Sequence, residues 1–468
     1  MSIFTLSSVS SADNFVDWDN SSLWAQGTVP DTSDAQVFFN DVGQNYFVQI
    51  GQSDSFSIGS FNLAANNLLL YGSLQSAGSL TIGSDAGIQI YGGRLSAQSL
   101  HVNGNGATTT GLFGVGEIDV AGPVYNGSTI IGGDATGLSD QTTLTLKAAY
   151  LSNSGLLEAA VGATFVVETA TASGFTNYGF GVLTGGSYMA QSNATLDLKT
   201  SGLVFNDAAT LILDGAGTDI IASYDPSTDR YVPIQQTLTL ITPSGTLELD
   251  AASYSTAGQL SVAGSLKLIG LADFTAASLY VTPGGKVSLM GAIPETTTSL
   301  SATRIIDDGQ ILIGANSGGE GKISGSVTGA GMILLAPEFV TVNRFGQTEI
   351  TTANAELAGS VSVNLAYSDG TGTFILDNPG SVTGRFQHFT AGDEIVLGSV
   401  MQSAVTGLSY AGSASSGVLT IQENGTALHL AFSGQYMTDN FVLGTDANTG
   451  WVSIVGVTPV SPAVVHAA

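Results

Sequence analysis

The chain has 468 residues, of which 37 are acidic and only 10 are basic, so its formal net charge is −27. Proteins that bind nucleic acids need clustered Lys and Arg to contact phosphates, so this balance argues against a nucleic-acid partner. Charged residues make up 10% of the chain, compared with about a quarter in ordinary globular domains. Hydrophobic residues reach 43%, enough for a large core. The exterior must therefore consist mainly of Ser, Thr, Asn, Gln and Gly.

The chain contains no cysteine, which excludes disulfides and thiolate metal sites. Residues 1–20, MSIFTLSSVSSADNFVDWDN, lack the basic segment and uninterrupted apolar run of a cleaved signal peptide. No apolar run is long enough for a transmembrane helix, so we expect no transmembrane segment. A cysteine-free chain is common among exported bacterial proteins, and we expect an extracellular or cell-surface location, reached without a cleaved N-terminal signal.

Residues 1–47 are expected to cap the fold. The segment VDWDNSSLWAQGTVPDTSDAQVFF (16–39) holds two of the three tryptophans, Trp18 and Trp24, and also Pro30. A repeat structure that adds strands along one axis leaves an exposed edge at each end, and such edges invite aggregation. We therefore expect the aromatic residues of this segment to cover the first strands.

The acidic stretch DNFVDWDN in the same segment is a candidate calcium site. Asp13, Asp17 and Asp19 offer the oxygen ligands that calcium prefers. The stretch lacks a glycine-centred loop and a glutamate at a defined offset, so a solvated acidic face is the alternative interpretation.

Residues 48–372 repeat a short pattern, in which a turn of small residues precedes alternating apolar residues. The stretch ITPSGTLEL (241–249) recurs as VTPGGKVSL (281–289), and AGSLKL (263–268) lies between the two. The first apolar residues of the three strands are 19 and 21 positions apart: Leu247, Leu266 and Val287. The period is therefore close to 20 residues, which is typical of a solenoid.

Residue types decide which solenoid to expect. Val, Ile, Leu and Thr alternate with period two, which predicts strands, and frequent glycine disfavours helices. The leucine-rich repeat pattern is not found. We expect an all-β, right-handed parallel β-helix with about 20 residues per turn. Stacked like charges repel in such a fold, which explains the low charge content.

Two acidic stretches within the repeats are candidates for catalysis. Parallel β-helices often carry polysaccharide lyases or glycoside hydrolases, which use carboxylates as acids and bases, commonly beside a basic residue. The candidates lie in YDPSTDRY and RIIDDG: Asp225, Asp229 and Arg230, and Arg304, Asp307 and Asp308. The alternative interpretation is turns and surface ion pairs, because the 10 basic residues are scattered along the chain.

A second calcium candidate is Asp219, in LDGAGTDII (213–221), which is similar to a single degenerate copy of a calcium-binding nonapeptide. One copy cannot build the stacked site that such repeats form. The four histidines are far apart in the sequence and form no HxH or HExxH motif. We therefore predict no cofactor, with calcium as the one ion to test.

Residues 373–457 are expected to form a small C-terminal β module, because the strands become longer and hairpin turns appear. In GVLTIQENGTALHLAF (417–432), the pair Asn424-Gly425 is a strong signal for a two-residue hairpin turn. The apolar tail, residues 458–468, is too short to fold alone. It is either a disordered end with a role in secretion or a strand that docks on a neighbouring subunit.

The stretch FILDNPGSVTGRFQHFTAGDEIVLGSV (374–400) resembles a module of large bacterial surface proteins, the β-strand-repeat or hemagglutinin-like family found in α-proteobacteria. Matching positions include Pro379, Gly392 and Asp393, and the continuation to Trp451 also resembles the end of that module. The opening W-x5-W-x-x-G-x-V-P, from Trp18 to Pro30, is similar to the start of many such chains. The resemblance implies a secreted or surface protein exported by type I machinery. It does not imply a particular ligand.

We therefore expect a secreted, non-enzymatic structural protein of the bacterial cell surface or biofilm matrix. It is expected to act as an adhesin, or as a fibre subunit that assembles through end-to-end contacts with other copies. Its expected partners are further copies of itself and a cell-surface or extracellular polysaccharide. The alternatives are a polysaccharide lyase or glycoside hydrolase and a glycan-binding protein like a phage tailspike.

Overall fold

The computed structural model divides the chain into two compact units, unit 1 (Met1–Leu238) and unit 2 (Thr239–Ala468). Strands account for 67% of the residues and helices for 4%, which confirms the predicted all-β class. The predicted boundaries between the N-terminal cap, the repeats, the C-terminal module and the tail, at residues 47/48, 372/373 and 457/458, stay predictions. The structure describes the following residues: 2–7, 15–39, 47–103, 110–133, 142–171, 173–291, 296–315, 319–336, 339–340, 349–350, 353–368, 371–447 and 449–457.

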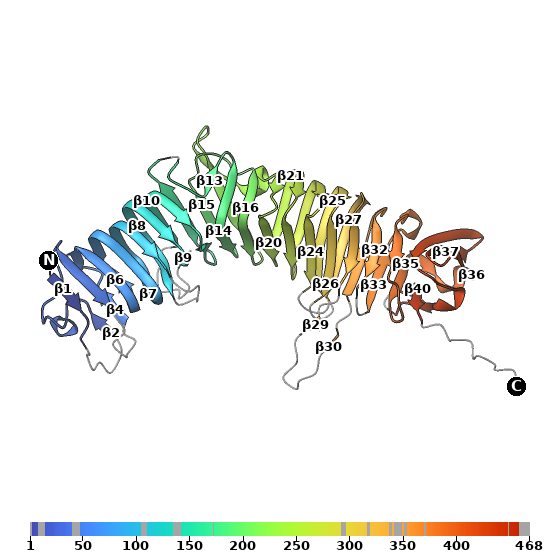
Figure 1. Cartoon of the computed structure of the whole chain (residues 1–468), viewed down its shortest axis with the longest axis horizontal. Coiled ribbons are helices and arrows are strands. Elements are labelled where there is room, and N and C mark those ends of the chain that lie inside the picture. The colour runs from blue at the N-terminus through green and yellow to red at the C-terminus, as the bar shows by residue number, and fades with distance from the viewer. Residues whose placement is uncertain are drawn as a thin grey trace. The chain divides into compact units, whose positions relative to one another are not determined.

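Unit 1 is a long, mostly parallel sheet that does not close on itself (Figure 1). Its strands are β1 (Ser2–Thr5), β2 (Phe15–Asp17), β3 (Ala35–Phe39), β4 (Phe47–Ile50), β5 (Ser55–Ile58), β6 (Ser60–Leu70), β7 (Ser73–Val102), β8 (Gly111–Asn126), β9 (Thr129–Gly132), β10 (Thr143–Asn153), β11 (Leu156–Ala159), β12 (Thr164–Thr169), β13 (Tyr178–Gly179), β14 (Val182–Gln191), β15 (Thr195–Leu198), β16 (Asn206–Asp214), β17 (Ile220–Asp225) and β18 (Arg230–Pro233). Two short helices complete its described part: η1 (Ser21–Leu23) and α1 (Ile234–Thr237).

Unit 2 has the same mostly parallel architecture, and antiparallel strands follow near its C-terminal end. Its strands are β19 (Leu240–Ile241), β20 (Thr246–Asp250), β21 (Ser253–Val262), β22 (Ser265–Ile269), β23 (Asp273–Val281), β24 (Lys286–Gly291), β25 (Thr297–Asp307), β26 (Gln310–Ala315), β27 (Glu320–Thr328), β28 (Met332–Leu335), β29 (Phe339–Val340), β30 (Glu349–Ile350), β31 (Ala353–Leu357), β32 (Asn364–Tyr367), β33 (Gly372–Leu376), β34 (Arg385–Gln387), β35 (Glu394–Met401), β36 (Val405–Gly412), β37 (Ser416–Glu423), β38 (Thr426–Ser433), β39 (Phe441–Thr445) and β40 (Trp451–Gly456). Its short helices are η2 (Pro379–Ser381), η3 (Gln402–Ala404) and η4 (Thr438–Asn440).

In the parallel part of unit 2, strands pair with a later strand, most often the second along the chain, rather than with the next one. β20, β22, β24, β26, β28 and β32 form one parallel series, and β21, β23, β25, β27, β31 and β33 form another. Register places Leu247, Leu266 and Val287 side by side, and all three are buried. The predicted steps of 19 and 21 residues are thus confirmed.

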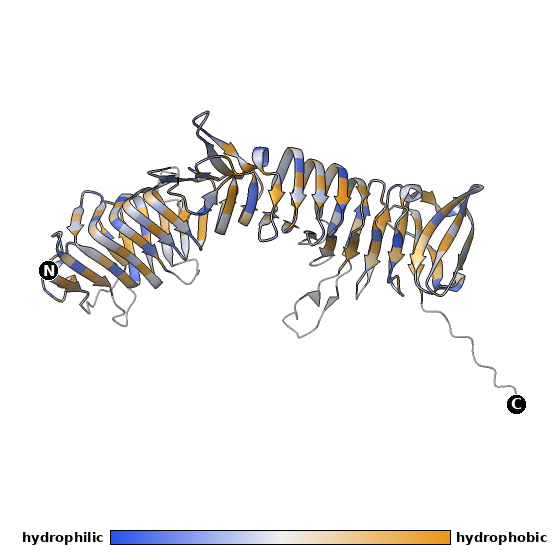
Figure 2. Cartoon of the chain, turned by 45° about the horizontal axis from the view of Figure 1, so that its top comes forward, coloured by the Kyte–Doolittle hydropathy of each residue, from blue (hydrophilic) through white to orange (hydrophobic). Residues whose placement is uncertain are grey.

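The turn that recurs in ITPSGTLEL and VTPGGKVSL brings the backbone of neighbouring strands very close together. A Cβ added at Gly285 would lie only 2.0 Å from the carbonyl oxygen of Val262. Glycine is therefore required at this position of the repeat. Apolar and polar residues alternate along the strands on either side of such turns (Figure 2).

A stack of buried asparagines crosses three successive layers of unit 1. Asn126 Nδ2 donates to Asn153 Oδ1 at 2.8 Å, and Asn177 Oδ1 accepts from the Asn153 backbone N–H at 2.6 Å. Asn177 Nδ2 also donates to the Asn153 carbonyl at 2.7 Å. The stack satisfies polar backbone groups that would otherwise be buried without partners.

We expect Asn153→Ala to lower the free energy of unfolding of unit 1 by about 1–3 kcal/mol, because the substitution removes an acceptor from a buried amide network. Urea unfolding followed by circular dichroism measures the change. Asn103 is exposed and serves as the matched control, since Asn103→Ala is expected to change stability by no more than about 0.5 kcal/mol. Equal losses in the two variants would contradict a role for the stack.

The N-terminal aromatic residues form a buried cluster. The exposed fractions of Trp18 and Trp24 are 0% and 2%, and their ring centroids lie 4.9 Å apart. Trp18 Nε1 donates to the carbonyl of Pro30, which is also buried, at 3.3 Å. Each indole therefore keeps its polar atom satisfied, since Trp24 Nε1 donates to the carbonyl of Trp18 at 2.9 Å.

The segment after η1 covers the outer edge of β1. Thr5 N–H donates to Gln26 Oε1 at 3.2 Å, and Ala25 N–H donates to the Thr5 carbonyl at 3.0 Å. The Ser7 N–H donates to the Leu23 carbonyl at 2.8 Å. These bonds satisfy backbone groups that an uncovered edge strand would present to other chains.

The C-terminal hairpin has the predicted two-residue turn. β37 and β38 pair antiparallel from Ser416↔Ser433 to Glu423↔Thr426, which leaves Asn424 and Gly425 as the loop. Both residues have positive φ, +47° and +85°, as a type I′ turn requires. In the described part of the chain, no helix has the length and apolar character needed to span a membrane.

Candidate functional site

A column of charged side chains runs across the outward face of unit 1. Register places Asp119 of β8 beside Lys147 of β10, and Lys147 beside Glu168 of β12. Lys199 follows β15, and its Nζ lies 3.5 Å from Glu168 Oε1. The sign of the charge therefore alternates along the column, which we call the charged column and define as Asp119, Lys147, Glu168 and Lys199.

Two further residues connect to the charged column through ion pairs. Arg94 contacts both Asp119 at 2.6 Å and Glu117 at 3.4 Å, and Lys147 Nζ lies 2.9 Å from Glu117 Oε1. The hydrogen bond from Lys147 lowers the pKa of Glu117 and raises the pKa of Lys147. The charged column and these two residues together comprise three basic side chains and three acidic ones, joined by ion pairs.

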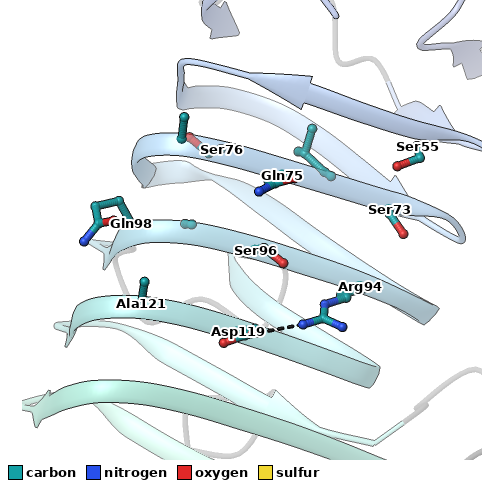
Figure 3. A pocket seen from close by; sticks show the side chains of 12 residues that line it. Ser55, Ser73, Gln75, Ser76, Arg94, Ser96, Gln98, Asp119 and Ala121 are labelled. Atoms are coloured by element: carbon teal, nitrogen blue, oxygen red, sulfur yellow. Dashed lines mark hydrogen bonds and ion pairs between the residues drawn. The ribbon is translucent and has the colours of Figure 1, made fainter. Parts of the chain in front are cut away.

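A hollow lies beside the charged column (Figure 3). It has a volume of about 620 Å³, and Ser55, Gln75, Ser96 and Gln98 are among its lining residues together with Arg94 and Asp119. A second hollow of about 300 Å³ adjoins it, since the two share Asp119 and Ala121. We call the two hollows together the alanine furrow, because several alanines contribute to its lining, among them Ala77, Ala121, Ala149 and Ala170.

The furrow follows from the residues of successive strands. An alanine side chain ends at Cβ, so alanines among longer side chains leave a depression in the surface. Figure 3 shows Gln75, Ser96 and Arg94 projecting from β7 towards the same side as Asp119 of β8. On the side that carries β7, the furrow is thus lined by neutral hydrogen-bonding groups together with Arg94.

Two tyrosines lie at the far end of the charged column. β17 and β18 form an antiparallel hairpin in which Tyr224 pairs with Tyr231, and their ring centroids are 5.5 Å apart. Lys199 Nζ lies 5.6 Å from the Tyr224 centroid. Burial raises the pKa of Tyr231, and the nearby carboxylate of Asp197 raises it further. Burial also raises the pKa of Asp197, to about 6.

The catalytic candidates Asp225, Asp229 and Arg230 come together at the tip of this hairpin. Asp225 accepts hydrogen bonds from the backbone N–H and hydroxyl of Ser227, at 2.9 and 2.7 Å. The Ser227 hydroxyl bond is the main reason why the pKa of Asp225 is lowered. Asp229 accepts a hydrogen bond from the Tyr224 hydroxyl, and Arg230 is exposed. The bonds of Asp225 are those of a turn.

The candidates Arg304, Asp307 and Asp308 do not face one another. Arg304 is exposed, whereas the side chain of Asp307 is fully buried on the opposite face of β25. Asp307 Oδ1 accepts from the Gly309 N–H at 3.1 Å, and burial raises the pKa of Asp307 to about 7. Asp308 Oδ1 accepts from the Ala330 N–H at 2.9 Å. Each carboxylate is engaged by a backbone N–H of a turn.

The calcium candidates lie in separate parts of unit 1. Asp13 lies outside the described residues. Asp17, on β2, accepts a hydrogen bond from Gln49, and Asp19 is exposed. Asp219 is 5% exposed and accepts from the Asn193 N–H at 2.8 Å. Among the residues that the structure describes, no group of three or more His, Asp or Glu side chains is arranged to hold a metal ion.

The residues taken from the C-terminal motif stabilise turns of unit 2. Asp393 is fully buried and accepts from the N–H and hydroxyl of Thr390, at 2.6 and 3.0 Å. Gly392 has φ +95°, which favours glycine. Pro379 is the buried first residue of η2, and Trp451 begins β40, which pairs antiparallel with β35.

One cluster of acidic residues in unit 2 was not among the candidates. Lys322 Nζ lies 2.5 Å from Glu356 Oε1, because β27 and β31 pair these two residues. Burial, followed by the charge of Glu356, raises the pKa of both Glu320 and Asp377. Three carboxyl groups and one lysine therefore share this part of the sheet face.

Comparisons with protein-family models, curated proteins and solved structures found no match. The fold and the site by themselves define a class: a β-strand protein with mostly parallel strands that presents a polar furrow beside paired charges. Sequence reasoning missed both the furrow and the charged column. The only sequence signal was the placement of Lys147 and Lys199 in strand segments, where each needs a carboxylate on the neighbouring strand.

Proposed function

We propose that the chain is a secreted, non-enzymatic structural protein of the bacterial cell surface or extracellular matrix, and that it acts as an adhesin. The observation that carries this proposal is the pairing of Arg94, Lys147 and Lys199 with carboxylates along the charged column. A catalytic centre requires groups with perturbed pKa values that converge on one reacting atom. Paired charges beside a long polar furrow are better suited to holding a ligand than to transforming it.

The fold that accompanies this function is a right-handed parallel β-helix in each unit. Pairing of strands with the second strand along the chain, as in β20–β22 and β22–β24, supports it, as does the asparagine stack. A register shift in β21 between Thr256 and Gln259 divides that strand into two segments, so that β20 and β21 supply three straight segments. Three segments in about 20 residues fit one turn of such a helix.

An adhesin is favoured over a fibre subunit because both terminal regions interrupt the parallel pairing. Gln26 and Ala25 cover the edge of β1, as described above. β40 pairs antiparallel with β35, with Ile395 opposite Ile454. End-to-end assembly into filaments is the alternative, and electron microscopy of the purified protein with and without calcium tests it.

A polysaccharide lyase or glycoside hydrolase remains the second candidate. The cluster of Glu320, Glu356, Asp377 and Lys322 favours it, since such enzymes combine carboxylates with a basic residue. A tailspike-like glycan-binding protein would be a trimer, which light scattering coupled to size-exclusion chromatography detects.

The deciding experiment incubates the purified protein with immobilised bacterial exopolysaccharides and measures both retention and cleavage. We expect the protein to be retained while the polymer keeps its length and releases no reducing or unsaturated ends. Release of such ends, with loss of release in Glu356→Gln, would replace the adhesin by the enzyme. Absence of retention on every polymer and on intact bacterial cells would contradict the adhesin.

A further inference from the structure

We propose that the alanine furrow and the charged column bind a neutral polysaccharide chain, which lies across the strands and ends against Tyr224 and Tyr231. This inference rests on the proposed adhesin function and names its ligand class. Three observations carry it: the length of the charged column, the pairing of its charges with one another, and the hydrogen-bonding character of the uncharged side chains that line the furrow.

The length of the column suits a polymer. Ser96, Asp119, Lys147 and Glu168 are neighbours in register on successive strand layers, and Lys199 and Tyr224 occupy the next two layers. Six layers at the usual spacing of about 4.8 Å extend over about 24 Å. A surface of this length takes several sugar rings, whereas a single small ligand would occupy only part of it.

The charges of the column favour a neutral ligand. Arg94 is held between Glu117 and Asp119, and Lys147 lies 2.9 Å from Glu117. An acidic polysaccharide would have to separate these pairs and approach a chain of net charge −27. A neutral hydroxyl can instead accept from Arg94 or donate to Asp119 while the ion pair stays in place.

The remaining groups of the furrow are free to bind hydroxyls. Gln75, Gln98 and Ser96 line the first hollow, and their side chains have no hydrogen-bond partner among the described residues. Each glutamine offers both a donor and an acceptor, which matches the dual character of a sugar hydroxyl. Together they give polar contacts without net charge.

The tyrosine pair provides an apolar surface at the far end of the charged column, beside Lys199. Tyr224 and Tyr231 are both half-buried, and they pack at an interplanar angle of 62°. The C–H face of a sugar ring packs well against such rings, in the same way as other apolar groups. The hairpin that sequence reasoning selected for catalysis therefore contributes aromatic residues rather than carboxylates to the site.

The test blocks the furrow without removing any hydrogen bond. Ala121 is exposed in both hollows, so Ala121→Trp fills the furrow. Ala411, an exposed residue of β36 in unit 2, provides the matched control Ala411→Trp. Affinity electrophoresis is run with soluble glucan, mannan and galactan as neutral probes, and with alginate and polygalacturonate as acidic probes.

We expect at least one neutral probe to retard the unmodified protein and Ala411→Trp equally. Ala121→Trp and the double variant Gln75→Ala/Gln98→Ala should each lose affinity about tenfold or more. Retardation should be insensitive to added salt, because no net charge is neutralised on binding. Circular dichroism verifies that every variant keeps its β structure.

Three results would overturn the inference: preference for an acidic probe, failure of all three neutral probes, or unchanged binding by Ala121→Trp. These outcomes are distinguishable from a failure of the adhesin function. If the protein is retained on exopolysaccharide but Ala121→Trp is retained equally, the adhesin stands and its binding surface lies elsewhere.

Discussion

Replacing Trp18 by alanine is expected to lower the free energy of unfolding of unit 1 by about 3–5 kcal/mol. Trp18 is fully buried, and its ring centroid lies 4.9 Å from that of Trp24 and 5.8 Å from those of Phe39 and Phe61. Removing the indole leaves a large cavity among rings that belong to several different segments. The bond from its Nε1 to Pro30 is lost as well.

Hydrogen exchange measured by mass spectrometry on peptides from β1 to β6 follows this change, because it reports the opening of these strands directly. Phe15 provides the matched control: it is 53% exposed and stacks on Phe47, so Phe15→Ala should cost less than about 1 kcal/mol. Protection that falls equally in both variants would show that the tryptophan cluster does not hold this end of unit 1 together.

The same variant also probes the covering of β1. Gln26 and Ala25 reach Thr5 from the segment that follows Trp24, which packs on Trp18. Loosening that segment exposes a strand edge, and we expect Trp18→Ala to form larger species in size-exclusion chromatography. A monodisperse variant would indicate that the segment stays in place without the indole.

The repeat could be predicted from the sequence because it depends on local patterns. Alternating apolar residues place Leu247, Leu266 and Val287 in one buried row, and small turn residues set where each strand begins. The turn of the C-terminal hairpin could be predicted for the same reason, since Asn and Gly readily adopt the positive φ values that a two-residue hairpin turn requires.

The charged column could not be predicted, because its members are separated by unequal lengths of chain. Asp119, Lys147, Glu168 and Lys199 meet only when the register of β8, β10, β12 and β15 is known. The segments between them differ in length, and a shift of one residue in any strand would turn its charge to the other face.

The grouping of Arg304 with Asp307 as one catalytic site could have been questioned from the sequence. Residues three positions apart on a strand point to opposite faces, so a strand at RIIDDG already places these two side chains apart. The structure shows Arg304 exposed and Asp307 buried. The burial of Asp307 itself was not predictable, because an acidic residue is seldom expected on the inner face.

That buried carboxyl gives the second large effect: Asp307→Asn is expected to stabilise unit 2 at alkaline pH. The pKa of Asp307 is about 7 in the folded chain, compared with 3.8 for an ordinary aspartate, because burial disfavours the carboxylate. The folded state therefore holds the proton more tightly than the unfolded state. The resulting stability is fully present below about pH 4 and is lost as the pH rises through about 7.

Asparagine carries no charge at any of these pH values, and its amide oxygen can still accept from the Gly309 N–H. The free energy of unfolding of Asp307→Asn, relative to that of the unmodified chain, should increase by roughly 2–3 kcal/mol between about pH 5 and about pH 8. Urea unfolding of both proteins at the two pH values measures it, and the comparison at each pH cancels the contributions of the other carboxyl groups.

Asp308→Asn is the matched control, because Asp308 is the adjacent carboxylate and its side chain is only half-buried. Its acceptor bond to the Ala330 N–H can be made by an amide oxygen, and its charge ranks well behind burial as a cause of the raised pKa of Asp307, so the stability that this variant gains with rising pH should be much smaller than that of Asp307→Asn. If Asp307→Asn shows no gain in stability at the higher pH, Asp307 must be ionised in the folded chain at little cost in free energy. A buried cation or water would then have to face it, and the inner face of β25 would be a polar site rather than part of the core.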